Sequence, residues 1–139
     1  VVTGIGRDTS AAHVALATLE SVGHQIADIV DEIRRDDPVT VLRADGGASV
    51  DPFMMQIQAN LIGCPIETSG RAELAAIGAA RMAAHALGRG VEFDSTTPVT
   101  TRYEPSINDD ARARRRDTWA DAVARSRGHV VRRERTPHV

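Results

Sequence analysis

The sequence contains no lysine and only one cysteine, Cys64. A single cysteine excludes a disulfide framework within the chain and a metal site built from several cysteines. Aromatic residues make up only 3% of the chain, so its core must be built mainly from Ala, Val, Ile and Leu. No apolar run is long enough to span a bilayer, and the N-terminal residues do not resemble a signal peptide. We therefore expect a cytoplasmic protein without a membrane partner.

Acidic and basic residues are unevenly distributed along the chain. The formal net charge is -2 at pH 7, which argues against nucleic acid as a partner. Residues 102–139 nevertheless contain ten arginines and six acidic residues, whereas residues 1–101 contain seven arginines and thirteen acidic residues. The arginines cluster most densely at Arg112, Arg114, Arg115 and Arg116. We interpret this cluster as the solvated face of a helix, with anion binding as the alternative.

The hydrophobic periodicity and the capping residues predict four helices and two short strands. The helices are expected at about 11–34, 52–62, 71–87 and 109–126, and the strands at about 39–44 and 64–68. Residues 89–105 are predicted to be a loop, and residues 128–139 a frayed or disordered tail. This order predicts an α/β fold with a parallel strand pair joined by a crossover. Because two strands make too small a sheet for a whole domain, the chain is expected to be a fragment.

Several residues carry specific expectations about these elements. Thr9 or Ser10 suits the N-cap of the first helix, and Asp51 suits that of the second, ahead of a proline at the first helical position. The second helix is expected to end at a left-handed Gly63 and to bury Phe53, Ile57 and Leu61. Gly78 costs about 1 kcal/mol in a helix interior, so it is expected to allow close backbone packing. Trp119 and Val123 are expected to anchor the last helix.

Few side chains outside the glycine turn point to chemistry. The histidines are expected to be exposed or to pack between helices, because none has a convincing metal-ligand spacing; they are His13, His24, His85, His129 and His138. Cys64 is interpreted as a small core residue. Asp45 is expected to accept hydrogen bonds from turn amides, with contact to a magnesium-bound water as the alternative. No metal site and no catalytic residue is therefore predicted in this chain.

The segment from Val39 to Phe53 carries the strongest functional signal. An apolar, β-rich run leads into an Asp-Gly-Gly turn, and the turn leads into a helix start. Glycines allow the backbone to approach a ligand closely, and the first amides of a helix have no partner within it. This pattern is typical of a phosphate or nucleotide site. The alternative is a strand-to-helix turn that binds nothing.

Four motifs in a fixed order resemble a known family. They occupy residues 42–48, 53–63, 65–67 and 73–80, and read LRADGGA, FMMQIQANLIG, PIE and ELAAIGAA. Together they resemble the C-terminal domain of the FGGY carbohydrate kinases, most closely the glycerol kinases within that family. The resemblance extends upstream to Thr9–His13 and downstream to Trp119–Arg125. We therefore expect residues 1–128 to be a segment of that domain and residues 129–139 to be a flexible tail.

The resemblance implies a fold and an activity. The fold is part of an actin-like ATPase domain, which is built on a ribonuclease-H-like sheet. Family members bind ATP in a cleft between two such domains and transfer its γ-phosphoryl group to a polyol or sugar hydroxyl, with Mg²⁺ offsetting the phosphate charge. Glycerol, converted to glycerol 3-phosphate, is the expected substrate, with another sugar such as xylulose as an alternative. A homo-oligomer is expected.

The resemblance also assigns nucleotide-binding residues. The backbone of Gly46, Gly47 and Ala48 is expected to line the adenosine part of the ATP site. Asp51 stands where glycerol kinases commonly have an Asn that meets the adenine. An aspartate can accept a hydrogen bond there but cannot donate one. The segments that carry the phosphate-binding loop and the catalytic carboxylate in the family have no match here. A non-catalytic remnant that binds nucleotide or a protein therefore remains an alternative.

Overall fold

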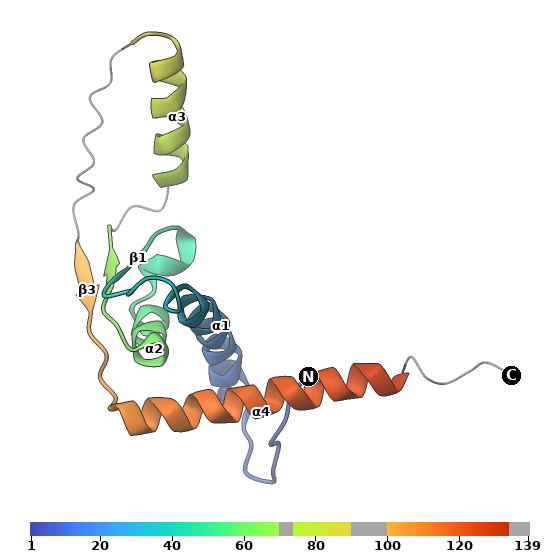
Figure 1. Ribbon diagram of the computed structural model, residues 1–139. Helices are drawn as coiled ribbons and strands as arrows, with labels where there is room; N and C mark the ends of the chain where they lie inside the picture. The colour runs from blue at the N-terminus through green and yellow to red at the C-terminus, as the bar shows by residue number, and fades with distance from the viewer. Residues whose placement is uncertain (70–73, 90–99, 134–139) are drawn as a thin grey trace, which may run out of the picture.

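The computed structural model describes residues 1–69, 74–89 and 100–133. Three short strands form one sheet, and two helices cover one of its faces (Figure 1). The elements in chain order are α1 (Ala11–Ile33), β1 (Leu42–Ala44), the 3₁₀ turn η1 (Gly47–Val50), α2 (Pro52–Ile62), β2 (Ile66–Thr68), α3 (Leu74–Ala86), β3 (Thr101–Tyr103) and α4 (Asp109–Arg133). The four predicted helices and both predicted strands are thus present.

Local capping chemistry sets the ends of α1 and α2, as predicted. The side chain of Ser10 accepts from the amide of His13, and the His13 ring accepts from the amide of Ser10, which forms a reciprocal capping box. Asp51 caps α2, with Pro52 at the first helical position. Gly63 ends α2 in the left-handed conformation, with φ at +72°. The predicted start of the third helix, near residue 71, lies outside the described residues.

The sheet has the order β1-β2-β3. The pairing of β1 with β2 is parallel, and α2 provides the crossover between them, as predicted. β3 pairs antiparallel with β2, so the prediction of a loop throughout residues 89–105 is wrong at Thr101–Tyr103. A three-residue strand leaves no clear alternation in the sequence, and its pairing with β2 is decided only by tertiary contacts. β1 is also shorter than predicted, because Val39–Val41 precede the strand.

The core lies between the sheet and the helices α1 and α2. Nine buried apolar residues form it, and they are Ala27, Val30, Met55, Ile57, Ala59, Leu61, Ile62, Cys64 and Ile66. The predictions for Ile57, Leu61 and Cys64 are confirmed. Phe53 was expected in the core, but it is 56% exposed in the described structure. It lies in the first turn of α2, where Pro52 is exposed as well.

The two core helices lie close together at Gly23 of α1. A Cβ added there would lie 2.9 Å from Cδ1 of Leu61 and 3.3 Å from Cγ2 of Ile57. Real Cβ contacts are longer, so an added Cβ would force the packed side chain of Leu61 to move. The absence of a side chain at this position therefore sets the spacing between α1 and α2.

The helix α3 stands apart from the other elements (Figure 1). None of its residues is buried in the described structure, and a Cβ added at Gly78 would meet no described atom within 4 Å. The expected close packing at Gly78 is therefore not formed within the described part of the chain. Gly88, which follows α3, adopts a left-handed conformation with φ at +67°.

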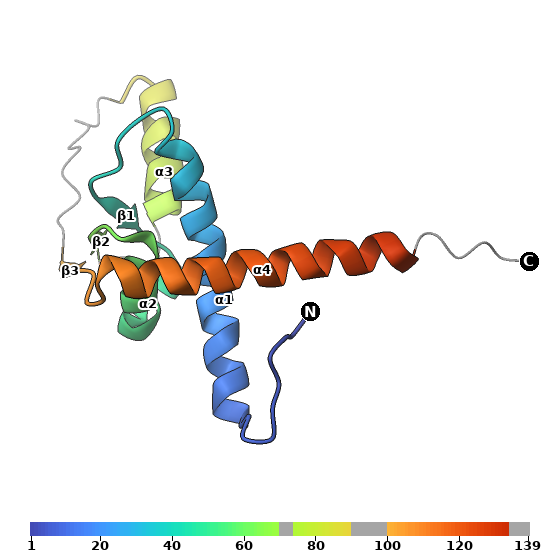
Figure 2. The ribbon, with the colours of Figure 1, turned by 60° about the horizontal axis from the view of Figure 1, so that its bottom comes forward.

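The helix α4 crosses α1 and runs on beyond it (Figure 2). It continues to Arg133, so the predicted end near Ser126 and the predicted frayed segment from 128 are wrong as far as Arg133. Trp119 and Val123, the expected anchors, are half-buried. Residues 134–139 of the predicted flexible tail lie outside the described residues.

The contrast between two glycines gives a test of this packing. We expect Gly23→Ala to lower the free energy of unfolding, because overpacking costs about 1–3 kcal/mol and outweighs the gain in helix propensity. Gly78→Ala meets open space and should stabilise α3 by about 1 kcal/mol. Urea unfolding measures the first effect, and amide hydrogen exchange within α3 measures the second. Equal effects of both substitutions would contradict the packing described here.

Candidate active site

The glycine turn follows directly on β1, at the end of the parallel strand pair. Gly46 adopts φ +89° and ψ 178°, a region of backbone conformation that is essentially restricted to glycine. The carbonyl oxygen of Gly46 accepts from the amide of Ser49 at 3.0 Å and from its hydroxyl at 2.8 Å. Ser49 is itself buried. The turn is therefore closed by a side chain that the sequence analysis did not identify.

The outer surface of this turn is open backbone. A Cβ added at Gly46 or at Gly47 would meet no described atom within 4 Å. Within the described ranges, the amides of Gly47 and Ala48 donate to no protein acceptor. Both residues are exposed. Two N–H donors and an uncovered stretch of backbone thus face outward, as a site for a closely approaching ligand requires.

The first amides of α2 are already satisfied by protein. Oδ1 of Asp51 accepts from the amide of Phe53 at 2.9 Å and from the amide of Met54 at 3.4 Å. The expectation that these amides point outward as free donors is therefore wrong. Asp51 is exposed, and its second oxygen, Oδ2, has no hydrogen bond to described residues. Asp51 is thus a helix cap with one oxygen left for a ligand.

The charge around the turn disfavours a phosphate group. Asp45 and Asp51 flank the glycines, and both are exposed carboxylates. Arg43, the middle residue of β1, pairs with Glu67 at 3.3 Å, and Glu67 also pairs with Arg102 at 2.6 Å. Two unneutralised carboxylates repel a phosphate but accept hydrogen bonds from uncharged N–H and O–H groups. The turn therefore suits the base or the sugar of a nucleotide better than its phosphates.

Asp45 does not hold the turn as expected. Within the parts of the chain that the structure describes, its carboxylate accepts no hydrogen bond from turn amides. Those same parts contain no group of three or more His, Cys, Asp and Glu side chains that could hold a metal ion. The residues present do not fit a resident Mg²⁺, and we derive no step through one.

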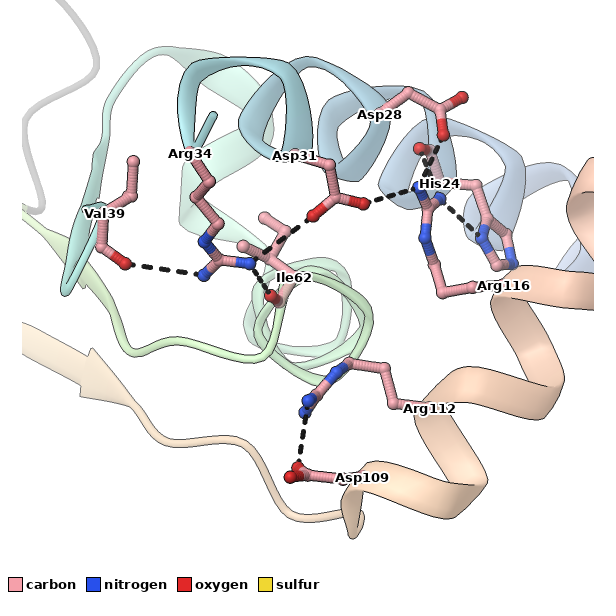
Figure 3. Close-up of polar contacts among 9 residues, drawn as sticks. All are labelled: His24, Asp28, Asp31, Arg34, Val39, Ile62, Asp109, Arg112 and Arg116. Atoms are coloured by element: carbon pink, nitrogen blue, oxygen red, sulfur yellow. Dashed lines mark hydrogen bonds and ion pairs between the residues drawn. The ribbon is translucent and has the colours of Figure 1, made fainter. Parts of the chain in front are cut away.

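A second polar cluster joins α4 to α1 (Figure 3). The guanidinium of Arg116 binds Asp28 at 2.5 Å, Asp31 at 3.0 Å and the carbonyl oxygen of His24 at 3.0 Å. Trp119 stacks on the ring of His24, with ring centroids 5.1 Å apart, and donates to Asp28 at 2.9 Å. The sequence gives no local sign of this cluster, because its members on α1 and α4 lie about ninety residues apart in the chain.

The interpretation of the arginine cluster as a solvated face is thus wrong for Arg112 and Arg116, whereas Arg115 is exposed although it forms an ion pair. Arg116 is largely covered in the cluster with α1. Arg115 pairs with Glu20 of α1 at 3.4 Å. The guanidinium of Arg112 pairs with Asp109 and lies over Gly63, where a Cβ would come within 2.5 Å of it (Figure 3). These arginines attach α4 to the body of the fold. Arg114 is exposed.

The helices of the described structure give no membrane-spanning segment, since none of them is both long and apolar enough.

Comparison with known proteins identifies the family of this arrangement. Residues 1–87 match the C-terminal domain of the FGGY family of carbohydrate kinases. Glycerol kinase 2 of Thermotoga maritima is 39% identical over 133 residues, which cover 92% of this chain and 27% of that protein. The glycerol kinase of Deinococcus radiodurans is 37% identical over 129 residues, covering 89% of this chain and 26% of that protein. The chain therefore spans about a quarter of the length of these relatives.

Solved structures give the same fold. Glycerol kinase of Plasmodium falciparum, crystallised with ADP, superposes with a TM-score of 0.73 at 28% identity and covers 88% of this chain and 26% of its own. Xylulose kinase of Lactobacillus acidophilus superposes with a TM-score of 0.67 at 19% identity, covering 92% of this chain and 26% of its own, which bears on the fold alone. The predicted α/β fold, as part of an actin-like ATPase domain, is confirmed.

The two glycines of the turn should differ in their tolerance of a side chain. We expect Gly46→Ala to cost about 1–3 kcal/mol of unfolding free energy, because alanine is strained at that backbone conformation. Gly47 has no positive φ and open space around it, so Gly47→Ala should leave the unfolding free energy nearly unchanged. Urea denaturation of both variants measures the difference, and equal stabilities would contradict the described turn.

Proposed function

This chain belongs to the FGGY family of carbohydrate kinases, and we propose that it is part of an enzyme that transfers the γ-phosphoryl group of ATP to a polyol. Glycerol is the substrate we favour, since the curated relatives described above are named glycerol kinases. This activity is that of a longer protein, because the chain corresponds to only about a quarter of those relatives. A cytoplasmic location and a homo-oligomeric state stay predictions.

We assign the adenosine part of the ATP site to Gly46, Gly47 and Ala48. The observation that carries this assignment is the open backbone of the turn, with two amides that have no partner among the described residues. The acidic flanks support a base or ribose at this position rather than a phosphate. The ADP named with the Plasmodium falciparum glycerol kinase supports nucleotide binding in this family.

Asp51 is the residue we expect to influence nucleotide affinity. Its Oδ1 caps α2, while Oδ2 is available to accept from the amino group of adenine. The Asn common at this position in glycerol kinases would also cap the helix and could donate from its amide. A missing donor at a partly buried contact costs about 1–3 kcal/mol. The aspartate should therefore weaken ATP binding relative to asparagine.

We assign no catalytic residue to this chain. Phosphoryl transfer depends on positioning the phosphates and stabilising their charge, and the described residues offer neither a cationic phosphate cradle nor a set of metal ligands. When bound, Mg²⁺ would offset phosphate charge, but the described side chains do not supply its site. The role proposed for this segment is to bind and orient the nucleoside.

The first test replaces Asp51 in the full-length protein. We expect Asp51→Asn to tighten ADP binding about fivefold or more, because the amide restores a hydrogen-bond donor to the adenine contact. The gain in binding free energy should not exceed about 3 kcal/mol. Isothermal titration calorimetry with ADP measures the change. Asp45→Asn is the matched control, since it removes the same charge from the same turn without touching the cap or the adenine contact.

Equal tightening by Asp51→Asn and Asp45→Asn would show a general charge effect and would remove Asp51 from the site. Gly47→Ala tests the backbone assignment independently. Its methyl group would stand where the nucleoside approaches, so we expect ADP binding to weaken by about tenfold, or about 1.4 kcal/mol. Unchanged affinity in a folded Gly47→Ala variant would refute the assignment of the turn.

The second test concerns the substrate. We expect the full-length protein to release ADP from ATP in a glycerol-dependent manner, as a coupled assay with purified protein measures. Xylulose serves as the comparison sugar. Turnover with xylulose and none with glycerol would overturn the glycerol assignment and leave the kinase proposal in place. Nucleotide binding without turnover on any polyol or sugar would favour the non-catalytic alternative.

A further inference from the structure

The helix α4 lies outside the buried apolar core, and it contacts both α1 and α2. The buried apolar core draws its residues from α1, α2, β2 and Cys64, and none of its nine members lies on α4. The described contacts of α4 with α1 are instead ion pairs, hydrogen bonds and one aromatic stack. Its C-terminal part projects past α1 (Figure 2). The attachment of α4 to α1 can therefore be lost without opening the core.

His24 lies at the centre of this attachment. The residue is buried, and one face of its ring stacks on Trp119. Its Nδ1 lies 3.3 Å from Nη1 of Arg116. An arginine can only donate, so Nδ1 must accept and the docked ring must be neutral. A single added proton at Nδ1 would turn this hydrogen bond into a contact between two donors.

The charged groups around His24 come from two helices. On α1 they are Glu20, Asp28 and Asp31, and on α4 they are Arg115 and Arg116. α2 carries no charged side chain, and the N-terminal segment adds only Val1, Val2 and Thr3 to the hollow beside His24. Glu20 pairs with Arg115, and Asp31 pairs with Arg34 at 3.5 Å as well as with Arg116. Asp28, which already binds Arg116, is the one carboxylate among these that favours a protonated His24.

We propose that α4 is a detachable arm, which separates from α1 when His24 takes up a proton while α1, α2 and the sheet stay folded. A protonated ring would face the guanidinium of Arg116 and would add a third positive charge to those of Arg115 and Arg116. The separation exposes the Trp119 ring and the α1 surface beneath it. This inference concerns the movement of α4 and does not depend on the proposed kinase activity.

The titration of His24 agrees with this geometry. Burial, and then the charge of Arg116, lower the pKa of His24 from 6.5 to about 4, against the opposing effect of Asp28. Burial raises the pKa of Asp28, but its hydrogen bonds from Trp119 and Arg116 bring it below its ordinary value, so Asp28 stays ionised. Docking thus favours neutral His24. The contribution of neutral His24 to the free energy of docking is complete above pH 6.5 and is lost as the pH falls from 6.5 towards 4.

Amide hydrogen exchange on the full chain tests the proposal. Between pH 7 and pH 5, one linked proton with these pKa values lowers the docking equilibrium constant roughly 20-fold. We expect protection factors in the first half of α4 to fall by up to that factor, while those in α2 stay unchanged. Emission from Trp119, the single tryptophan, should shift to longer wavelength over the same range, because its ring becomes exposed to water.

Two histidine variants complete the design. His24→Gln removes the titrating group, so its α4 protection should not change between pH 7 and pH 5. His85→Gln is the matched control, since His85 is an exposed histidine on α3, and it should respond to pH as the unmodified chain does. If His24→Gln does not fold, the unmodified chain still decides. Simultaneous loss of protection in α2 and α4, or constant protection in α4 down to pH 5, overturns the proposal.

Discussion

The close approach of α1 and α2 at Gly23 is the constraint on which the other elements depend. Because no side chain separates the helices there, Leu61 and Ile57 reach the surface of α1 and close the core. Arg34, at the end of α1, adds a hydrogen bond of 2.7 Å to the carbonyl oxygen of Ile62 (Figure 3). This pairing sets the position of α2, and α2 in turn is the crossover that brings β2 alongside β1. The candidate nucleotide turn lies between β1 and α2, so its position follows from the same contact.

Two parts of the structure are held together by different kinds of interaction. Apolar burial holds α1, α2 and the sheet together, whereas α4 is joined by arginines, carboxylates and the stack of Trp119 on His24. Buried apolar contacts do not depend on pH, but a polar attachment built around a neutral histidine does. The turn at Gly46 belongs to the apolar part, which is consistent with a site that keeps its shape when α4 moves.

Sequence analysis predicted the local features well and the non-local ones poorly. Ser10, Asp51 and Gly63 act within one or two helical turns, so their roles as caps could be predicted from neighbouring residues. The roles of β3, Ser49 and Arg116 depend on partners that only the folded chain brings close. Gly46 and Gly47 were predicted as site residues from the turn and the family resemblance. The structure adds their open backbone and corrects the role of the α2 amides, which Asp51 already satisfies.

The sequence by itself determined the helices, their caps, the parallel strand pair and the family, because each rests on short-range patterns or on motifs in a fixed order. Tertiary structure alone decided that Phe53 is exposed, that Gly23 rather than Gly78 is the point of close packing within the described residues, and that the arginines of α4 bind α1. Burial and ion pairing depend on which surfaces meet, and residues far apart in the chain carry no local sign of that meeting.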